Sequence, residues 1–333
     1  MLELVCPAGS PAALHAALEQ GADAIYVGAN NRSNARAFPG LNFTADDLAA
    51  SCKLVHSRQR KIYLALNTYP RPDDLPLWRS TLDQAAAAGV DAFIIAEMAM
   101  LDYAARTWPG IPRHLSVQGS ATNLASLQFF HQQFGISRAV LPRVLSLQQV
   151  ERLAEKSPVA LEVFGFGSLC IMVEGRCQLS SHVTGKSPNC DGVCSPAESV
   201  HWEEIGNERR RVRLGEILID EFQPGEAASY PTVCKGRYST GGAFNYALEE
   251  PTSLNTLSLL PQLAAAGIAA IKIEGRQRGP AYVSRVVQVW RQALDAVKRD
   301  PQHFTVQSEW QNSLSHVAEG RQTTLGPYQR QWH

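Results

Sequence analysis

Seven short apolar runs, each followed by an amphipathic stretch, fill the first 165 residues and restrict the fold more than any other feature of the chain. The runs are rich in Val, Ile and Ala, and they cover residues 2–8, 22–29, 61–68, 90–97, 113–120, 137–144 and 159–166. Strands this apolar are typical of a parallel sheet covered on both faces. Their alternation with helical segments therefore predicts an α/β fold.

The segments between these runs carry the signals of helix ends. Thr44 and Ser146 precede amphipathic stretches and are expected to be N-caps, because their hydroxyls can accept a hydrogen bond from a free backbone N–H. Gly21, Gly89 and Gly135 stand where a helix commonly ends in a left-handed residue. These positions predict helices that alternate with the apolar strands.

The strand–helix pattern stops near residue 170 and returns at residue 256. A helix over 256–267, an eighth strand over 269–275 and a long helix over 280–300 complete the series. Eight such units with one insertion after the seventh strand predict a TIM-type (β/α)8 barrel. A doubly wound open sheet is the alternative, because periodicity does not reveal closure.

This reading divides the chain into four parts. Residues 1–169 hold the first seven βα units, and residues 170–255 form a cysteine-rich insertion. Residues 256–300 hold the eighth unit with its closing helix, and the polar tail 301–333 is expected to pack along the surface.

Charge and the N-terminal sequence set the expected environment. Lys plus Arg number 31 and Asp plus Glu number 31, so the zero net charge gives no sign of nucleic-acid binding. The start, MLELVCPAGS, is not typical of a secretory signal, and no apolar run is long enough to span a bilayer. We therefore expect a cytoplasmic protein whose thiols are reduced.

Most of the seven cysteines lie in the insertion. Cys6 and Cys52 are expected to be small buried hydrophobes. The main set is separated by 6, 16 and 39 residues and consists of Cys170, Cys177, Cys194 and Cys234. On spacing alone, this set is open to an iron–sulfur cluster, to zinc or to unligated thiols. Cys190 is a further thiol in a turn-like stretch, and it could be a spare.

The insertion is rich in glycine and is expected to lack the apolar mass to order itself, so that a metal would organise it. Other catalytic patterns are missing from the sequence. It contains no H-E-x-x-H, no G-x-S-x-G and no dinucleotide-binding G-x-G-x-x-G that opens a helix after a strand.

The stretch EVFGFGSLCIMVEGRCQLS (162–180) resembles the signature of the collagenase-like peptidase family. The residues that carry this resemblance are Glu162, Phe164, Gly167, Ser168, Leu169, Cys170, Gly175, Cys177, Leu179 and Ser180. Further stretches, among them YPTVCKGRY, EEPTSLNTL and IKIEGRQRGPAYVS, are similar to members of that family that act in an anaerobic, O2-independent route to ubiquinone. The resemblance covers nearly the whole chain.

The resemblance implies a barrel that carries a [4Fe–4S] cluster on Cys170, Cys177, Cys194 and Cys234, with Cys190 outside the set. It implies hydroxylation of aromatic ring precursors of ubiquinone, with prephenate as the oxygen donor. The implied partners are a related cluster protein, UbiV, in a heterodimer, and a UbiT-like lipid carrier. No nucleic acid is expected.

Two other functions stay open. Related family members hydroxylate RNA bases, so an RNA-base hydroxylase is one alternative. A non-catalytic, cluster-bearing scaffold or electron carrier is the other. Peptidase activity is not expected, because neither a nucleophile with a positioned base nor a site for a metal-bound water is evident in the sequence.

Polar residues at the predicted strand ends are candidates for the pocket, since barrel enzymes place their chemistry there. They are Asn67, Glu97, Gln118, Ser120, Arg143, Glu162, Glu274 and Arg276. The catalytic candidates among them are Arg143, Arg276, Asn67, Gln118 and Glu274. An arginine matches a carboxylate with two parallel hydrogen bonds, so Arg143 and Arg276 are predicted to hold an anionic oxygen donor.

Overall fold

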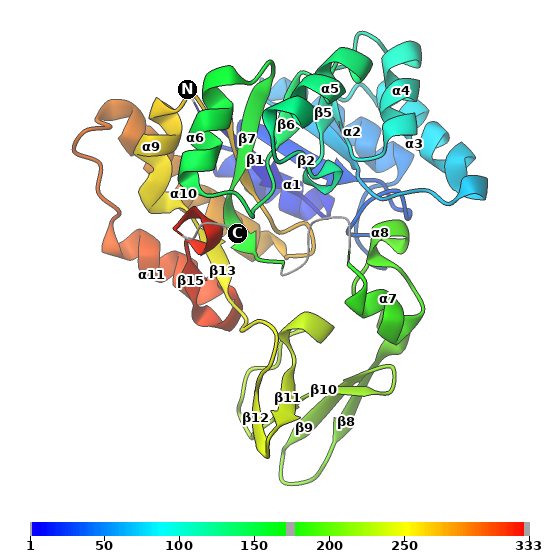
Figure 1. The fold of residues 1–333 in the computed structure, drawn as a ribbon, viewed down its shortest axis with the longest axis vertical. Helices are drawn as coiled ribbons and strands as arrows, with labels where there is room; N and C mark the ends of the chain where they lie inside the picture. Colours follow the sequence, from blue (N-terminus) through cyan, green and yellow to red (C-terminus); the bar gives the residue numbers. More distant parts are fainter. Residues whose placement is uncertain (1, 171–176, 330–333) are drawn as a thin grey trace.

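The chain forms a closed barrel of parallel strands, seen in the upper part of Figure 1 in a computed structural model that describes residues 2–170 and 177–329. Each barrel strand pairs with the next, and β14 pairs with both β1 and β7. The strands are β1 (Glu3–Pro7), β2 (Ala24–Gly28), β3 (Lys61–Leu66), β4 (Ala92–Ile95), β5 (Arg113–Leu115), β6 (Arg138–Val140), β7 (Ala160–Ser168) and β14 (Ala270–Ile273). The predicted TIM-type barrel is confirmed, because the pairing of β14 with both β1 and β7 closes the ring of strands, whereas an open sheet has two unpaired edges.

Helices surround the barrel (Figure 1). They are α1 (Pro11–Glu19), α2 (Ala45–Ser57), α3 (Leu75–Ala88), α4 (Met98–Thr107), α5 (Leu124–Phe134), α6 (Leu147–Lys156), α9 (Leu260–Ala265) and α10 (Pro280–Arg299). Thr44 and Ser146 cap α2 and α6 as predicted, and each takes part in a reciprocal capping box. The main core lies between strands and helices, where Trp78 and Trp290 are fully buried.

Several predicted strands extend too far at their C-terminal ends. The expected strand over 113–120 ends at Leu115 and is followed by a 3-10 turn, Val117–Gly119. The Ser116 hydroxyl accepts from the backbone of Gln118 and begins that turn. The helix expected over 256–267 is likewise a 3-10 turn, Leu257–Leu259, followed by α9. Apolar residues continue through these turns, so the sequence pattern alone did not mark where strand pairing stops.

The insertion projects away from the barrel as an arm (Figure 1). It holds α7 (Leu179–Thr184) and α8 (Pro188–Asp191), an antiparallel sheet of β8 (Val200–Glu204), β9 (Arg210–Leu214) and β10 (Ile217–Phe222), and a hairpin of β11 (Arg237–Thr240) and β12 (Ala243–Tyr246). The expectation that this segment lacks apolar mass was wrong. It builds a small core of its own from Val212, Leu214, Ile219, Phe222 and Val233.

The arm leaves the barrel and returns to it at one place. Strand β13 (Ser253–Asn255) runs antiparallel to the end of β7, with Ser253 opposite Ser168. The tail forms α11 (Ser308–Val317) and then β15 (Thr323–Thr324), which pairs with β13. The tail therefore packs beside the arm's return point, while Gly175 of the signature and residues 330–333 lie outside the described residues.

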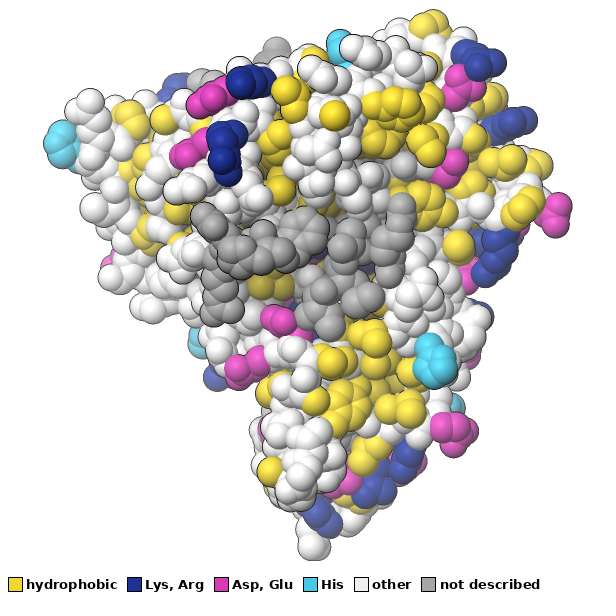
Figure 2. All heavy atoms as spheres, viewed as in Figure 1, with side chains coloured by type: hydrophobic (Ala, Val, Ile, Leu, Met, Phe, Trp, Pro, Cys, Tyr) yellow, Lys and Arg dark blue, Asp and Glu magenta, His cyan; other side chains and the backbone are white. Residues whose placement is uncertain are grey.

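Much of the large exposed apolar surface in the described chain lies on the arm. Figure 2 shows hydrophobic side chains gathered on the arm next to the barrel. Exposed large hydrophobic residues of the arm are Trp202, Ile217, Tyr230, Phe244, Tyr246 and Leu248. Among the helices of residues 2–170 and 177–329, none combines the length and apolar character needed to cross a membrane.

Candidate functional site

The barrel interior contains a column of charged side chains. Lys272 on β14 donates to the fully buried Glu162 on β7 at 2.7 Å. Arg138 binds the other oxygen of Glu162 at 3.0 Å and continues to Glu3 at 3.0 Å. The prediction that Glu162 lies in the pocket at the C-terminal strand ends was wrong, because it is the third of the nine residues of β7 and its ion pairs hold it within the barrel.

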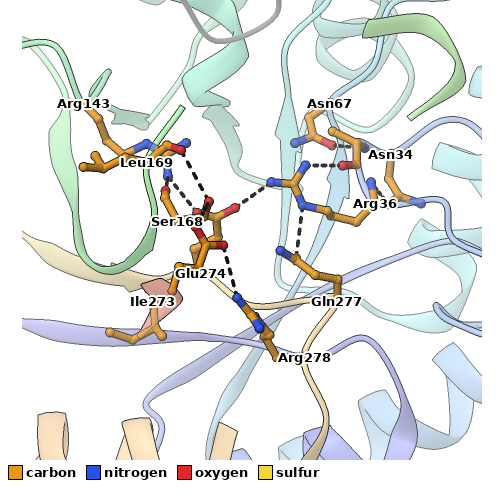
Figure 3. A network of polar contacts seen from close by, with 12 residues as sticks. Asn34, Arg36, Asn67, Arg143, Ser168, Leu169, Ile273, Glu274, Gln277 and Arg278 are labelled. Carbon is orange, nitrogen blue, oxygen red and sulfur yellow. Dashed lines mark hydrogen bonds and ion pairs between the residues drawn. The ribbon is translucent and has the colours of Figure 1, made fainter. Parts of the chain in front are cut away.

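Glu274 is the central carboxylate at the C-terminal mouth, directly after β14 (Figure 3). Its Oε1 accepts from Arg36 at 2.6 Å, and its Oε2 accepts from Arg143 at 2.8 Å. Burial alone would raise the pKa of Glu274, but the charges and hydrogen bonds of Arg143 and Arg36 outweigh it and hold the pKa at about 2. Glu274 is therefore an ionised anchor between two arginines rather than a proton donor at neutral pH.

Arg143 follows β6 and already has several partners. Besides Glu274, its Nη1 donates to the carbonyl of Ser168 at 2.6 Å. Its guanidinium also lies over the Phe164 ring, 4.4 Å from the centroid. These contacts hold Arg143 at the wall of the mouth and offset its charge.

Arg276 lies two residues beyond Glu274 and is only 4% exposed. Its Nη1 donates to Asn34 Oδ1 at 2.9 Å, and its guanidinium lies 5.6 Å from the centroid of the Tyr26 ring. No carboxylate of the described chain forms an ion pair with it. Burial lowers the pKa of Arg276 to about 10, so it is still a cation at neutral pH. Of the two predicted arginines, Arg276 is thus the one that forms no ion pair within the described residues, although the charge of Glu274 still acts on it.

Asn67 and Gln118 occupy different positions at the mouth. Asn67 Oδ1 accepts from the backbone N–H of Ala35 at 2.9 Å and holds the loop that carries Asn34 and Arg36. The Oε1 atom of Gln118 is buried, and no hydrogen-bond partner satisfies it within residues 2–170 and 177–329. A buried acceptor without a donor is costly, and it is expected where a ligand or water completes the contact.

Two other candidates have local roles or special geometry. Glu97 caps α4 by accepting from the backbone of Met100. Ser120 adopts a left-handed conformation, with φ of 54°, at the end of the turn that carries Gln118. The helix-capping role accounts for Glu97 without any part in chemistry.

All seven cysteines of the chain are free thiols, and the four predicted ligands are all among the described residues. Cys194 interacts electrostatically with Cys177, and Cys234 interacts with both Cys170 and Cys194. We call Cys170, Cys177, Cys194 and Cys234 the thiol centre. Burial raises the pKa of Cys234 to about 11, so its thiol is protonated at neutral pH unless a metal binds it.

The donor chemistry of the thiol centre fits an iron–sulfur cluster, which is held by cysteine thiolates. In the part of the chain that the structure describes, no three His, Cys, Asp or Glu side chains are already arranged to hold a metal ion. Cys170 and Cys177 also border the undescribed residues 171–176.

Arg36 and Glu319 belong to this site and were missed by the sequence analysis. Arg36 comes from the loop between β2 and α2, far from any predicted strand end. Glu319 comes from the tail, where its carboxylate binds Lys235, accepts from the Ser168 hydroxyl at 3.2 Å and accepts from Arg278 at 3.1 Å. Only the folded structure brings these loop and tail residues beside the cysteine segments, so no sequence spacing could have revealed them.

Three of the described histidines have side-chain hydrogen bonds. Side-chain hydrogen bonds of the described histidines go to Asp91, to the Ile136 carbonyl and to Asp300.

The fold defines a TIM-type barrel protein with cysteines in the segment that follows β7. The chain belongs to peptidase family U32, whose family model matches residues 9–331. The predicted resemblance to collagenase-like peptidases is confirmed at the level of this family.

Relatives in the family carry different names. The chain is 30% identical to the tRNA hydroxylation protein P1 of Bacillus subtilis (strain 168), over 95% of this chain and 68% of that protein. It is 29% identical to the tRNA hydroxylation protein P of Escherichia coli (strain K12), over 88% of this chain and 68% of that protein. It is also 29% identical to the Porphyromonas gingivalis (strain ATCC BAA-308 / W83) collagenase, over 95% of this chain and 70% of that protein. The chain thus spans about two thirds of the length of these relatives.

Proposed function

We propose that this chain is the iron–sulfur subunit of an O2-independent hydroxylase that acts on aromatic ring precursors of ubiquinone, the role of UbiU. The observation that carries the proposal is the thiol centre at the same barrel mouth as Arg276, a buried cation without a carboxylate partner. The hydroxylation proteins among the relatives support a hydroxylase rather than a peptidase. The resemblance described above favours the quinone route.

In this proposal the four thiolates hold a [4Fe–4S] cluster, which supplies one-electron chemistry when bound. Arg276 binds a carboxylate of the oxygen donor, for which prephenate is the candidate, because that ion pair would compensate its buried charge. Gln118 accepts a hydrogen bond from a hydroxyl of the bound molecule. Arg143, kept in place by Glu274 and Ser168, shapes the wall of the mouth.

The proposed partners are UbiV, in a heterodimer, and a UbiT-like lipid carrier. The exposed apolar side chains of the arm, including Trp202, Phe244 and Leu248, support an interaction with another protein. Large exposed apolar patches are uncommon on monomers and often mark interaction sites.

An RNA-base hydroxylase is the second candidate, and the names of the tRNA hydroxylation proteins favour it. It requires binding of single-stranded RNA through basic and aromatic side chains, with strong salt dependence. Fluorescence anisotropy with a tRNA probe at two salt concentrations tests it. Tight, salt-dependent binding would favour RNA, whereas the quinone proposal expects weak binding.

The cofactor is tested on protein prepared without oxygen. We expect iron and sulfide in about equal amounts and a visible absorption that dithionite bleaches. Serine in place of Cys170, Cys177, Cys194 or Cys234 should lower the iron content, whereas Cys190→Ser should not. Equal iron in all five variants, or zinc in place of iron, would contradict the proposed centre.

The activity is tested by reconstitution with UbiV, a quinone precursor and prephenate. Arg276→Gln should raise the KM for prephenate and leave the iron content unchanged, because Arg276 is proposed to touch the donor and not the metal. Product formed by UbiV alone would instead make this chain a scaffold or electron carrier. An unchanged KM would refute the role of Arg276.

A further inference from the structure

Arg36 is held in a fixed position at the barrel mouth. Its backbone N–H donates to Asn34 Oδ1 at 3.0 Å, and its backbone carbonyl accepts from the Asn42 side chain at 2.7 Å. Its guanidinium reaches Glu274 at 2.6 Å and Gln277 at 3.2 Å (Figure 3). The loop between β2 and α2 therefore presents one ordered positive charge to the mouth.

The cysteine-bearing arm packs directly on this loop. Gly192, two residues before Cys194, is so close that a Cβ atom added there would lie 2.3 Å from the carbonyl oxygen of Asn34 and 3.1 Å from the Cβ of Ala37. Its φ of 84° is also left-handed, so the position suits glycine. This close approach packs the segment that carries Cys194 against the loop that carries Arg36.

We propose that Arg36 is a positioning and tuning residue shared by Glu274 and the thiol centre, and that its charge raises the reduction potential of the bound cluster. This inference rests on the proposed function, since it assumes that the cluster forms. A reduced cluster carries one more negative charge than an oxidised one. A fixed cation on the loop against which the Cys194 segment packs therefore stabilises the reduced state.

The carboxylate of Glu274 allows a test based on the direction in which the reduction potential shifts. Glu274 is ionised and bonds to Arg36, so it offsets part of the positive field that reaches Cys194. Removing the positive charge should lower the potential, and removing the negative charge should raise it. A general loosening of the site would not move the potential in opposite directions in the two variants.

The experiment is a dithionite titration of the anaerobic protein, followed by electron paramagnetic resonance, in which the cluster accepts one electron. The variants are Arg36→Gln, Arg36→Lys and Glu274→Gln. The control is Arg71→Gln, which removes a cation that pairs with Asp191 at 2.8 Å on the same arm. Iron content and thermal unfolding are measured for each, so that loading and folding are known before potentials are compared.

We expect Arg36→Gln to lower the midpoint potential by about 59 mV, which is a tenfold change in a one-electron equilibrium. Arg36→Lys should retain most of the parent potential, Glu274→Gln should raise it, and Arg71→Gln should leave it unchanged. If Arg36→Gln does not load iron, the upward shift in Glu274→Gln still decides the question. Loaded variants with unchanged potentials, or shifts of the same sign in Arg36→Gln and Glu274→Gln, would overturn the role of Arg36. A parent protein without a cluster would overturn the proposed function itself.

Discussion

Glu162→Gln should destabilise the barrel and leave the thiol centre intact, because Glu162 is the buried partner of Lys272 rather than a pocket residue. Removing one member of a buried ion pair leaves the other charge uncompensated and costs about 3–5 kcal/mol. At roughly 2 °C per kcal/mol for a large domain, the melting temperature should fall by about 6–10 °C. Lys272→Met should cost less, since Arg138 still binds Glu162 at 3.0 Å.

The assay is thermal unfolding followed by circular dichroism, with iron content measured on the same samples. The double variant Glu162→Gln/Lys272→Met should lose less stability than the sum of its two single variants, because both remove the same pair. Glu155→Gln is the control, since it removes the same charge from an exposed position of α6. A Glu162→Gln protein that melts like the parent, or that loses iron while keeping its stability, would refute this reasoning.

Three further perturbations test other contacts. Glu319→Gln removes the carboxylate that binds Lys235, and it should cost about 1–3 kcal/mol in urea unfolding; an unchanged midpoint would show that the tail does not brace the arm. Gly192→Ala should cost at least about 1 kcal/mol, because its Cβ would lie 2.3 Å from the Asn34 carbonyl oxygen at a positive φ; parent-like stability would contradict the close packing. Burial alone would raise the pKa of Glu3, but its basic and hydrogen-bonded partners lower it from 4.5 to about 2. Its contribution to stability is therefore present above about pH 4.5 and is lost as the pH falls through 2. The free energy of unfolding should fall by about 2 kcal/mol between pH 6 and pH 3. Urea unfolding that shows no such loss would contradict the ion pairing of Glu3.

The barrel could be predicted from the sequence because its strands and helices repeat a local pattern. Thr44 and Ser146 cap their helices through contacts only three residues away, which a sequence displays directly. The position of Glu162 could not be predicted, because a charged residue in a strand gives no sign of an interior partner such as Lys272, 110 residues away in the chain.

The sequence identified several residues of the candidate site, but it did not show which contacts each of them makes. Arg143 and Arg276 were both recognised as mouth residues, yet only the structure distinguishes the arginine that Glu274 neutralises from the one without a carboxylate partner. Arg36 escaped prediction because it lies in a loop, where neither periodicity nor spacing identifies a function. Long-range pairing of charges is a property of the fold rather than of local sequence.

The antiparallel pairing of Ser168 with Ser253 places the two ends of the arm side by side on the barrel rim. The barrel can therefore close regardless of how many residues the arm contains, since β7 and β14 pair directly with each other. Lengthening an inserted arm of this kind costs little free energy, because the entropy of loop closure grows only slowly with loop length. The rim can therefore carry arms of different length and surface without any change in the barrel.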